Sequence, residues 1–136
     1  MVAVEFNVNF DEAKEINIYN DGSKTSYTVG EQPFVDIVEK WNELLTGSRE
    51  MPAFGVSLND ETVKAIQNGL WIEFDFCKQK EHNGMTYEKL LVEVKDEYCG
   101  FNMIRYTKYK GYDGRCFYID LVDKNMSNLY DYLMNI

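Results

Sequence analysis

Side chains that could do chemistry concentrate in the C-terminal half of the chain. Glu73, Asp75 and Asp120 are carboxylates at alternate positions of two predicted strands. Such oxygen ligands suit a hard divalent cation, and two neighbouring carboxylates can divide acid and base roles because one raises the pKa of the other. The same pattern also arises on an ordinary solvated sheet face with cross-strand ion pairs. We favour that last interpretation and expect no metal site and no catalytic set.

Large aromatic side chains are expected on the same face of the sheet as these carboxylates, because successive side chains of a strand point to opposite faces. Trp71, Tyr87 and Tyr118 are expected on the outward face of the sheet, where they are larger than solubility requires. This indicates a binding face for a protein or a ligand. Arg105 lies in a strand with two plausible inward sets, Phe101/Met103/Arg105 and Asn102/Ile104/Tyr106, so its facing stays open. The residues predicted to bind are Trp71, Glu73, Asp75, Tyr87, Arg105, Tyr112, Tyr118 and Asp120.

The segment 108–115, KYKGYDGR, is a second candidate for contact with a partner. Its glycines and basic side chains could admit an anion, but it lacks the phosphate-binding-loop pattern and no helix follows it. A hairpin loop with its turn at Asp113-Gly114 is the commoner interpretation. Tyr112 would then be available for contact.

Histidine and cysteine chemistry has little support. Structural zinc sites bring their ligands in close pairs, whereas the spacing here is wide and irregular. The only histidine, His82, lies in a polar loop and is expected to be solvent-exposed, with no cysteine or serine placed against it. The zinc set considered and set aside is Cys77, His82, Cys99 and Cys116.

Hydrophobic periodicity gives the elements that must position these residues. Strands alternate with period two, whereas apolar residues of helices recur every three or four positions. Asp21-Gly22 is a hairpin signal, and Pro33 suits the first turn of a helix. The predicted elements are strands over 2–10, 14–19 and 25–29, helices over 33–46 and 59–68, strands over 70–77, 87–95, 101–108 and 115–122, and a helix over 126–134. We expect a single α+β domain, residues 1–136, with order βββ–αα–ββββ–α and helices packed on one face of a mostly antiparallel sheet.

Charge is unevenly distributed along the 136 residues. The net charge is −9, and residues 1–62 hold twelve acidic and four basic side chains, whereas residues 98–136 carry a net charge of +1. This disfavours direct nucleic-acid binding and favours a protein partner with a basic surface. Three cysteines without close pairs, no signal peptide and no long apolar run predict a cytoplasmic protein with no membrane contact.

These observations predict a non-enzymatic acidic interaction domain that binds another macromolecule, as an inhibitor or immunity-type protein would. The alternative is a small-ligand binding domain or enzyme that uses the outward face of the C-terminal sheet. A concave pocket on that face would favour the alternative, and a filled face would count against it. We expect no cofactor. Homodimerisation through the sheet face or an edge strand is compatible with both hypotheses.

Overall fold

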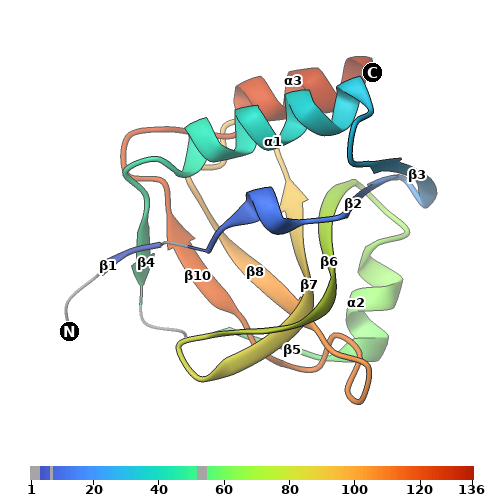
Figure 1. Ribbon diagram of the computed structural model, residues 1–136, viewed down its shortest axis with the longest axis vertical. Coiled ribbons are helices and arrows are strands. Elements are labelled where there is room, and N and C mark those ends of the chain that lie inside the picture. Colours follow the sequence, from blue (N-terminus) through green and yellow to red (C-terminus); the bar gives the residue numbers. More distant parts are fainter. Residues whose placement is uncertain (1–3, 7, 52–54) are drawn as a thin grey trace.

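A curled antiparallel sheet with helices on both sides forms the molecule (Figure 1). The computed structural model describes residues 4–6, 8–51 and 55–136. Eight described strands follow the spatial order β1-β4-β10-β8-β7-β6-β2-β3, and β5 pairs separately with β9. The strands are β1 (Val4–Glu5), β2 (Glu15–Asn20), β3 (Ser23–Thr28), β4 (Arg49–Met51), β5 (Val56–Ser57), β6 (Leu70–His82), β7 (Met85–Val94), β8 (Gly100–Tyr106), β9 (Gly114–Arg115) and β10 (Phe117–Asp120). The helices are η1 (Phe10–Glu12), α1 (Gln32–Leu45), α2 (Asn59–Ala65) and α3 (Ser127–Asn135).

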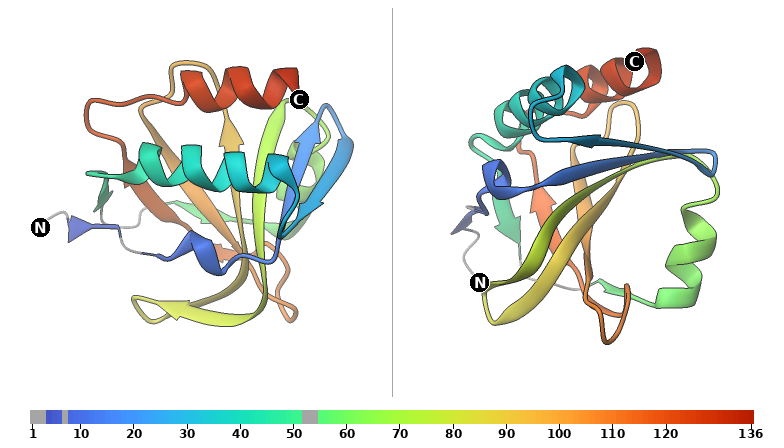
Figure 2. Two further views of the ribbon diagram at one scale, coloured as in Figure 1. Left: turned by 45° about the horizontal axis from the view of Figure 1, so that its top comes forward. Right: turned by 45° about the vertical axis from the view of Figure 1, so that its right-hand side comes forward.

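The main core lies between the sheet and the pair α1 and α3, which run side by side over one face (Figure 2). The apolar stripe of α1 predicted from its spacing points into this core. Trp41 is fully buried, and its ring contacts the rings of Phe10, Phe74 and Phe101 at centroid distances of 5.5, 5.0 and 5.7 Å. Alternate residues of β6, including Ile72 and Phe74, complete the core from the sheet. The predicted α+β class is thereby confirmed.

The second helix departs from the predicted arrangement. Whereas α1 and α3 share one face, α2 lies on the other side of the sheet (Figure 2). Ile66, which directly follows α2, packs with Trp71, Leu91 and Tyr112 in a second buried cluster. The outward positions of β6 and β7 therefore include apolar side chains that need cover, and α2 supplies part of it.

The first predicted strand is shorter than expected. Strand β1 covers only Val4–Glu5, and Phe10 begins the 3-10 helix η1, whose Asn9 side chain accepts a hydrogen bond from the Asp11 N–H at 3.0 Å. Residues 1–3 and 7 of the predicted strand lie outside the described part of the chain. The turn at Asp21-Gly22 joins β2 to β3 as predicted, with φ of 50° and 90° at its two positions.

The predicted loop over residues 78–84 is wrong. Strand β6 continues to His82, and Asn83-Gly84 alone forms the turn into β7, with positive φ at both residues. An Asn-Gly pair is a strong hairpin signal, so the sequence held the information to place this turn. The longer hairpin brings His82 close to β4.

Candidate functional site

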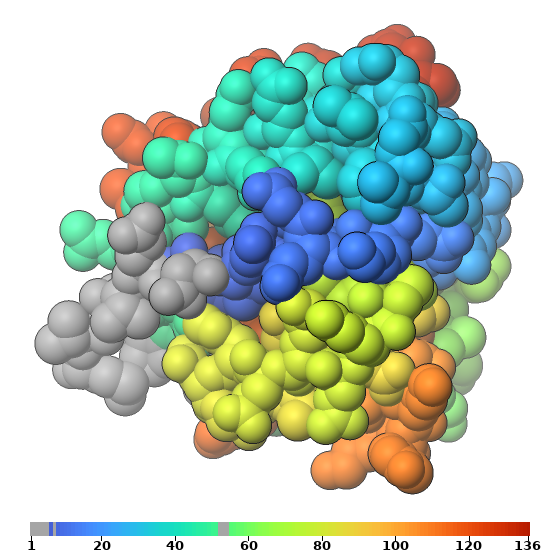
Figure 3. All heavy atoms as spheres, in the orientation of Figure 1, coloured from blue at the N-terminus to red at the C-terminus, as the bar shows by residue number. Residues whose placement is uncertain are grey.

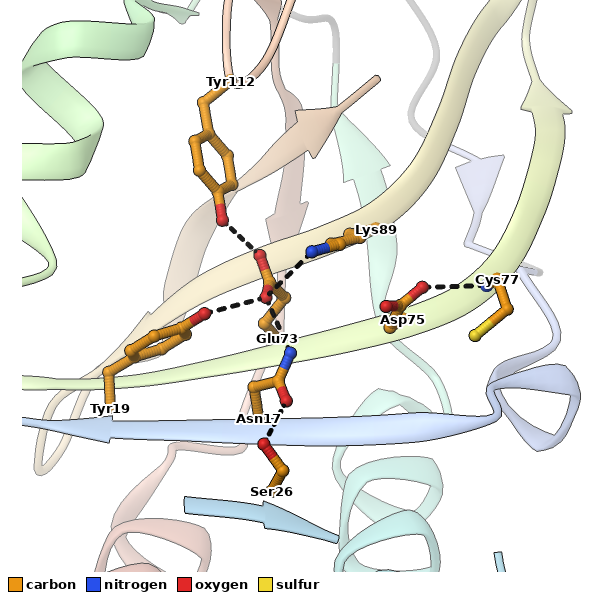
Figure 4. Close-up of polar contacts among 8 residues, drawn as sticks. All are labelled: Asn17, Tyr19, Ser26, Glu73, Asp75, Cys77, Lys89 and Tyr112. Atoms are coloured by element: carbon orange, nitrogen blue, oxygen red, sulfur yellow. Dashed lines mark hydrogen bonds and ion pairs between the residues drawn. The ribbon is translucent and has the colours of Figure 1, made fainter. Parts of the chain in front are cut away.

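A buried carboxylate on β6 organises the outer face of the sheet (Figure 4). Glu73 is 0% exposed, and its oxygens accept hydrogen bonds from Asn17 Nδ2 at 2.9 Å, the Tyr19 hydroxyl at 3.1 Å and the Tyr112 hydroxyl at 2.5 Å. Ser26 Oγ extends the network from β3 by donating to Asn17 Oδ1 at 2.7 Å. A buried carboxylate is tolerated only when it is paired or hydrogen-bonded, and these three donors satisfy that requirement.

Lys89 supplies the positive charge nearest to this carboxylate. Its Nζ lies 4.0 Å from Glu73 Oε1 and 4.7 Å from the centroid of the Tyr106 ring. The Tyr106 ring in turn meets the Tyr112 ring edge-on at 5.0 Å. The ammonium therefore lies between a carboxylate and an aromatic face, both of which attract a positive charge.

The segment 107–115 crosses the outer face as a strap held at several points. The Tyr112 hydroxyl bonds to Glu73, and the Tyr112 N–H donates to Asn59 Oδ1 at 3.0 Å. Asp113 Oδ1 accepts from the Asn59 N–H at 2.5 Å, and Glu88 accepts from the Lys108 N–H at 2.9 Å. Tyr112 is buried, so the prediction that it is available for contact is wrong.

Burial of the two tyrosines affects their titration. Burial, followed by the neighbouring Glu73 charge, raises the pKa of Tyr112 and the pKa of Tyr19 well above the ordinary value. Both hydroxyls therefore keep their protons, and their hydrogen bonds to Glu73, through the neutral pH range.

Alkaline pH is expected to destabilise the protein through this network. The unfolded chain loses a tyrosine proton near pH 10, whereas folded Tyr112 holds its proton to higher pH. The contribution of protonated Tyr112 to the free energy of unfolding is complete below about pH 10 and declines as the pH rises above that value. Urea unfolding between pH 8 and about pH 11 measures the decline, which Tyr112→Phe should reduce. Tyr109→Phe, at a ring that is 97% exposed, is the control and should leave the slope unchanged.

Predicted facing was correct for Trp71 and Glu73, but predicted exposure was wrong. Both side chains point away from the main core but are buried on the outer face. Ile66 packs with Trp71 there, and Tyr112 bonds to Glu73. Their sheet partners Tyr19 and Asn17 lie on the same outer face. The outward face is therefore filled at its centre, and a substrate could not reach Glu73 in this state.

Tyr87 lies on the other side from the one predicted. A register shift between Asp75 and Lys80 interrupts the pairing of β6 with β7, and Cys77 there has a φ of 59°. The alternation restarts beyond this bulge, so Tyr87 enters the main core and meets the Phe76 ring at 5.5 Å. Burial raises the pKa of Tyr87 to about 12.

The remaining predicted carboxylates bond locally. Asp75 Oδ1 accepts from the Cys77 N–H at 2.8 Å, and Asp120 Oδ1 accepts from the Val122 N–H at 2.8 Å. Both are half-buried and serve turns of their own strands. Tyr118 is half-buried and lines a shallow hollow of about 340 Å³ with Tyr98 and Asn102. The structure does not bring these three predicted residues together with Glu73.

Arg105 takes the inward set that contains Phe101 and Met103, both of which are buried in the core. Its side chain leaves the core at the end of β8, where Nε donates to the Arg115 carbonyl at 2.7 Å and a terminal nitrogen donates to the Thr86 carbonyl at 2.6 Å. Burial lowers the pKa of the Arg105 guanidinium. Arg105 therefore ties β8 to β7 and β9 instead of presenting its charge to a partner.

His82 is half-buried, so its predicted solvent exposure is wrong. Its ring lies between the rings of Phe6 and Phe117 at centroid distances of 5.2 and 5.1 Å, and Nε2 is 2.5 Å from Glu50 Oε1. Asn83 Nδ2 donates to the other Glu50 oxygen at 2.8 Å. The contact fastens the end of the β6–β7 hairpin to β4.

None of the protein-family models, curated proteins or solved structures compared with the chain matches it. Within the described residues, no three or more His, Cys, Asp or Glu side chains come together as a metal site. Among those same residues, no helix combines the length and apolar character that crossing a membrane requires.

A groove along α1 is the surface that sequence reasoning missed. It has a volume of about 520 Å³ and lies where α1 meets η1 and the turn after β3, on the side of the molecule seen in Figure 3. Its apolar lining comes from Val29, Phe34, Val35 and Val38, and its acidic lining from Asp11, Glu39 and Glu43. None of the described residues that line it is basic.

One sequence signal could have located this groove. Val35 lies outside the buried stripe of α1 and is 47% exposed, and Val29, just before the helix, is 61% exposed. Apolar side chains at exposed positions next to a helix stripe widen its apolar face beyond what the core covers. Asp11 is positioned by η1 and accepts a hydrogen bond from Asn42 Nδ2 at 3.0 Å, which joins η1 to the groove wall.

Proposed function

We propose that the protein is a non-enzymatic, acidic interaction domain that binds a basic, amphipathic segment of another protein in the α1 groove. The observation that carries the proposal is the composition of this groove, whose described lining combines an apolar floor with three carboxylates and includes no basic side chain. A partner segment with apolar residues on one side and lysine or arginine on the other complements both features.

The charge distribution supports the same class of partner. Residues 1–62 have a net charge of −8, and η1, β3 and α1 all belong to this region. A field of this sign accelerates encounter with a basic protein and repels nucleic acid. An inhibitor or immunity-type protein that covers a basic functional surface would need this property.

The alternative of a ligand site or enzyme on the outward sheet face has less support. Trp71, Glu73 and Tyr87 are buried, and the strap 107–115 covers the carboxylate that would have been central to the chemistry. The described residues that line the hollow beside Tyr118 include one carboxylate, Glu93, and no second acid beside it.

Binding of two designed peptides tests the proposal. Both consist of lysine and leucine in the same proportion. In one the leucines recur at helical spacing, and in the other they alternate with lysine. Fluorescence anisotropy at low salt should detect binding of at least one peptide, and added salt should weaken it. Glu39→Lys combined with Glu43→Lys should weaken binding about tenfold, since two attractive contacts become repulsive.

The matched control is Glu61→Lys combined with Glu97→Lys, which makes the same charge change at two exposed positions away from the groove. If both double variants weaken binding equally, the peptides recognise overall charge, and the groove is not the site. If neither peptide binds the unaltered protein, the proposal is wrong.

A further inference from the structure

The edge strand β3 continues directly into the groove. Among the described strands, β3 is the last in the sheet order and pairs only with β2, and its side chains are exposed at five of its six positions. Val29 and Gly30 follow it at once and line the groove. An extended segment that leaves the groove at this end therefore arrives beside an open sheet edge.

Hydrogen bonds at Thr28 reveal which backbone groups of β3 are free. The Thr28 N–H donates to Glu31 Oε1 at 2.8 Å, and the Thr28 carbonyl accepts from the Glu31 N–H at 3.1 Å. Both groups consequently point away from β2. In an antiparallel pair, this orientation recurs at every second residue, so the backbone groups of Lys24 and Ser26 also point outward.

The edge is thus open over a short stretch and closed at one end. Glu31 satisfies Thr28, whereas Lys24 and Ser26 each present an N–H and a carbonyl at the end of the sheet. Edge strands in natural proteins are commonly blocked by proline, bulges or several charges. Strand β3 has no proline, pairs with β2 in unbroken register, and has Lys24 as its one charged residue.

The negative charge around β3 favours some added strands over others. Glu15, Asp21 and Glu31 flank β3, and the neighbouring groove is acidic. A second copy of the chain, itself with a net charge of −9, would bring like charges together. A basic extended segment would bring opposite charges together.

We infer that the partner segment is extended and adds a strand beside β3, pairing with Lys24 and Ser26 before its apolar side chains enter the α1 groove. This inference rests on the proposed function and specifies how the partner is held. Main-chain hydrogen bonds to β3 would contribute affinity, and the groove would select apolar and basic side chains.

Amide hydrogen exchange of the unaltered protein, followed by NMR, tests the inference with the alternating lysine–leucine peptide as probe. In the free protein, the Thr25 and Tyr27 amides should exchange slowly because they face β2, whereas the Lys24 and Ser26 amides should exchange quickly. Saturating peptide should slow exchange at Lys24 and Ser26 about tenfold or more. The alternating peptide should also bind more tightly than the helical one.

Lys24→Pro compared with Lys24→Thr provides the second measurement. Proline removes an N–H that faces away from β2, which an edge strand tolerates, and threonine removes the same charge but keeps the N–H. Lys24→Pro should weaken binding of the alternating peptide about fivefold relative to Lys24→Thr, the effect of one lost hydrogen bond.

The outcomes separate this inference from the proposed function. If the groove charge reversals weaken binding but β3 amides stay unprotected and Lys24→Pro behaves like Lys24→Thr, the strand addition is wrong and the groove stands. If neither the groove nor the edge responds to the peptide, both are wrong. If the Lys24 and Ser26 amides become protected from exchange without peptide as the protein concentration rises, the occupant is a second copy of the chain and the inference is wrong.

Discussion

Replacing Glu73 by alanine is expected to lower the free energy of unfolding by about 3–5 kcal/mol. The substitution leaves Asn17, Tyr19 and Tyr112 without the carboxylate that accepts their hydrogen bonds, and it leaves Lys89 without its nearest negative charge. Donors that lose their partner in a buried site cost more than the hydrogen bonds themselves contribute. A cavity at a fully buried position adds to the effect.

Chemical unfolding in urea, followed by tryptophan fluorescence, measures this change. Glu93→Ala is the control because Glu93 lies on the neighbouring strand β7, two residues beyond the residue that pairs with Glu73, and is partly exposed. Within the described part of the chain, its one ion-pair partner is Lys95, at 3.9 Å. The control should change stability by less than about 1 kcal/mol. Equal effects of the two substitutions would show that the Glu73 network is not what stabilises the outer face.

Coupling between Glu73 and Tyr112 can be isolated with the same measurement. In a double-mutant cycle with Glu73→Gln and Tyr112→Phe, the two changes should be non-additive by about 1–3 kcal/mol, since the two side chains share a hydrogen bond. Additive effects would mean that the 2.5 Å contact contributes nothing beyond packing.

Phe10→Ala is expected to destabilise the protein by about 3–5 kcal/mol, although Phe10 belongs to a single turn of 3-10 helix. Its ring is buried and meets the Phe74 ring at 4.8 Å, the Trp41 ring at 5.5 Å and the Phe76 ring at 5.9 Å. The substitution therefore opens a cavity where the helix layer, the sheet and η1 meet.

Thermal unfolding by circular dichroism should show this as a lower Tm, with Val29→Ala as the control. Val29 is apolar but mostly exposed, so its truncation should change stability by no more than about 0.5 kcal/mol. Because Phe10 anchors η1, Phe10→Ala should also weaken peptide binding through the displaced Asp11 of the groove. An unchanged Tm would mean that η1 does not contribute to the core.

Much of the fold follows from periodicity, because alternation along one strand depends on that strand alone. Ile72, Phe74 and Phe76 lie in the core as predicted, and Trp71 and Glu73 face the other way. Exposure depends on distant parts of the chain. Nothing in the spacing of β6 indicates that Tyr112 and α2 return to cover it.

Irregular backbone limited the prediction at two other places. The bulge near Cys77 reverses the facing of Tyr87, and no residue type in that segment demands positive φ. The β6–β7 hairpin was missed although Asn83-Gly84 is a strong turn pair, because the polar residues before it resemble a loop. Asp11 of η1 lines the α1 groove, but the alternation of residues 2–10 predicts a strand that runs up to the start of η1. The 3-10 helix, and the groove wall that it forms, were therefore not predicted.

The polar network of the outer face has a consequence for how the chain folds. Glu73 receives hydrogen bonds from residues 39, 54 and 56 positions away, on both sides of it in the sequence. Such contacts form only after long loops have closed, which is slow. Until β2 and the strap 107–115 have both docked, the carboxylate is hydrated and burial of the outer face is opposed. A chain truncated before Tyr112 lacks one of the three donors to Glu73, so burial of the outer face in such a chain would leave part of the carboxylate without a partner.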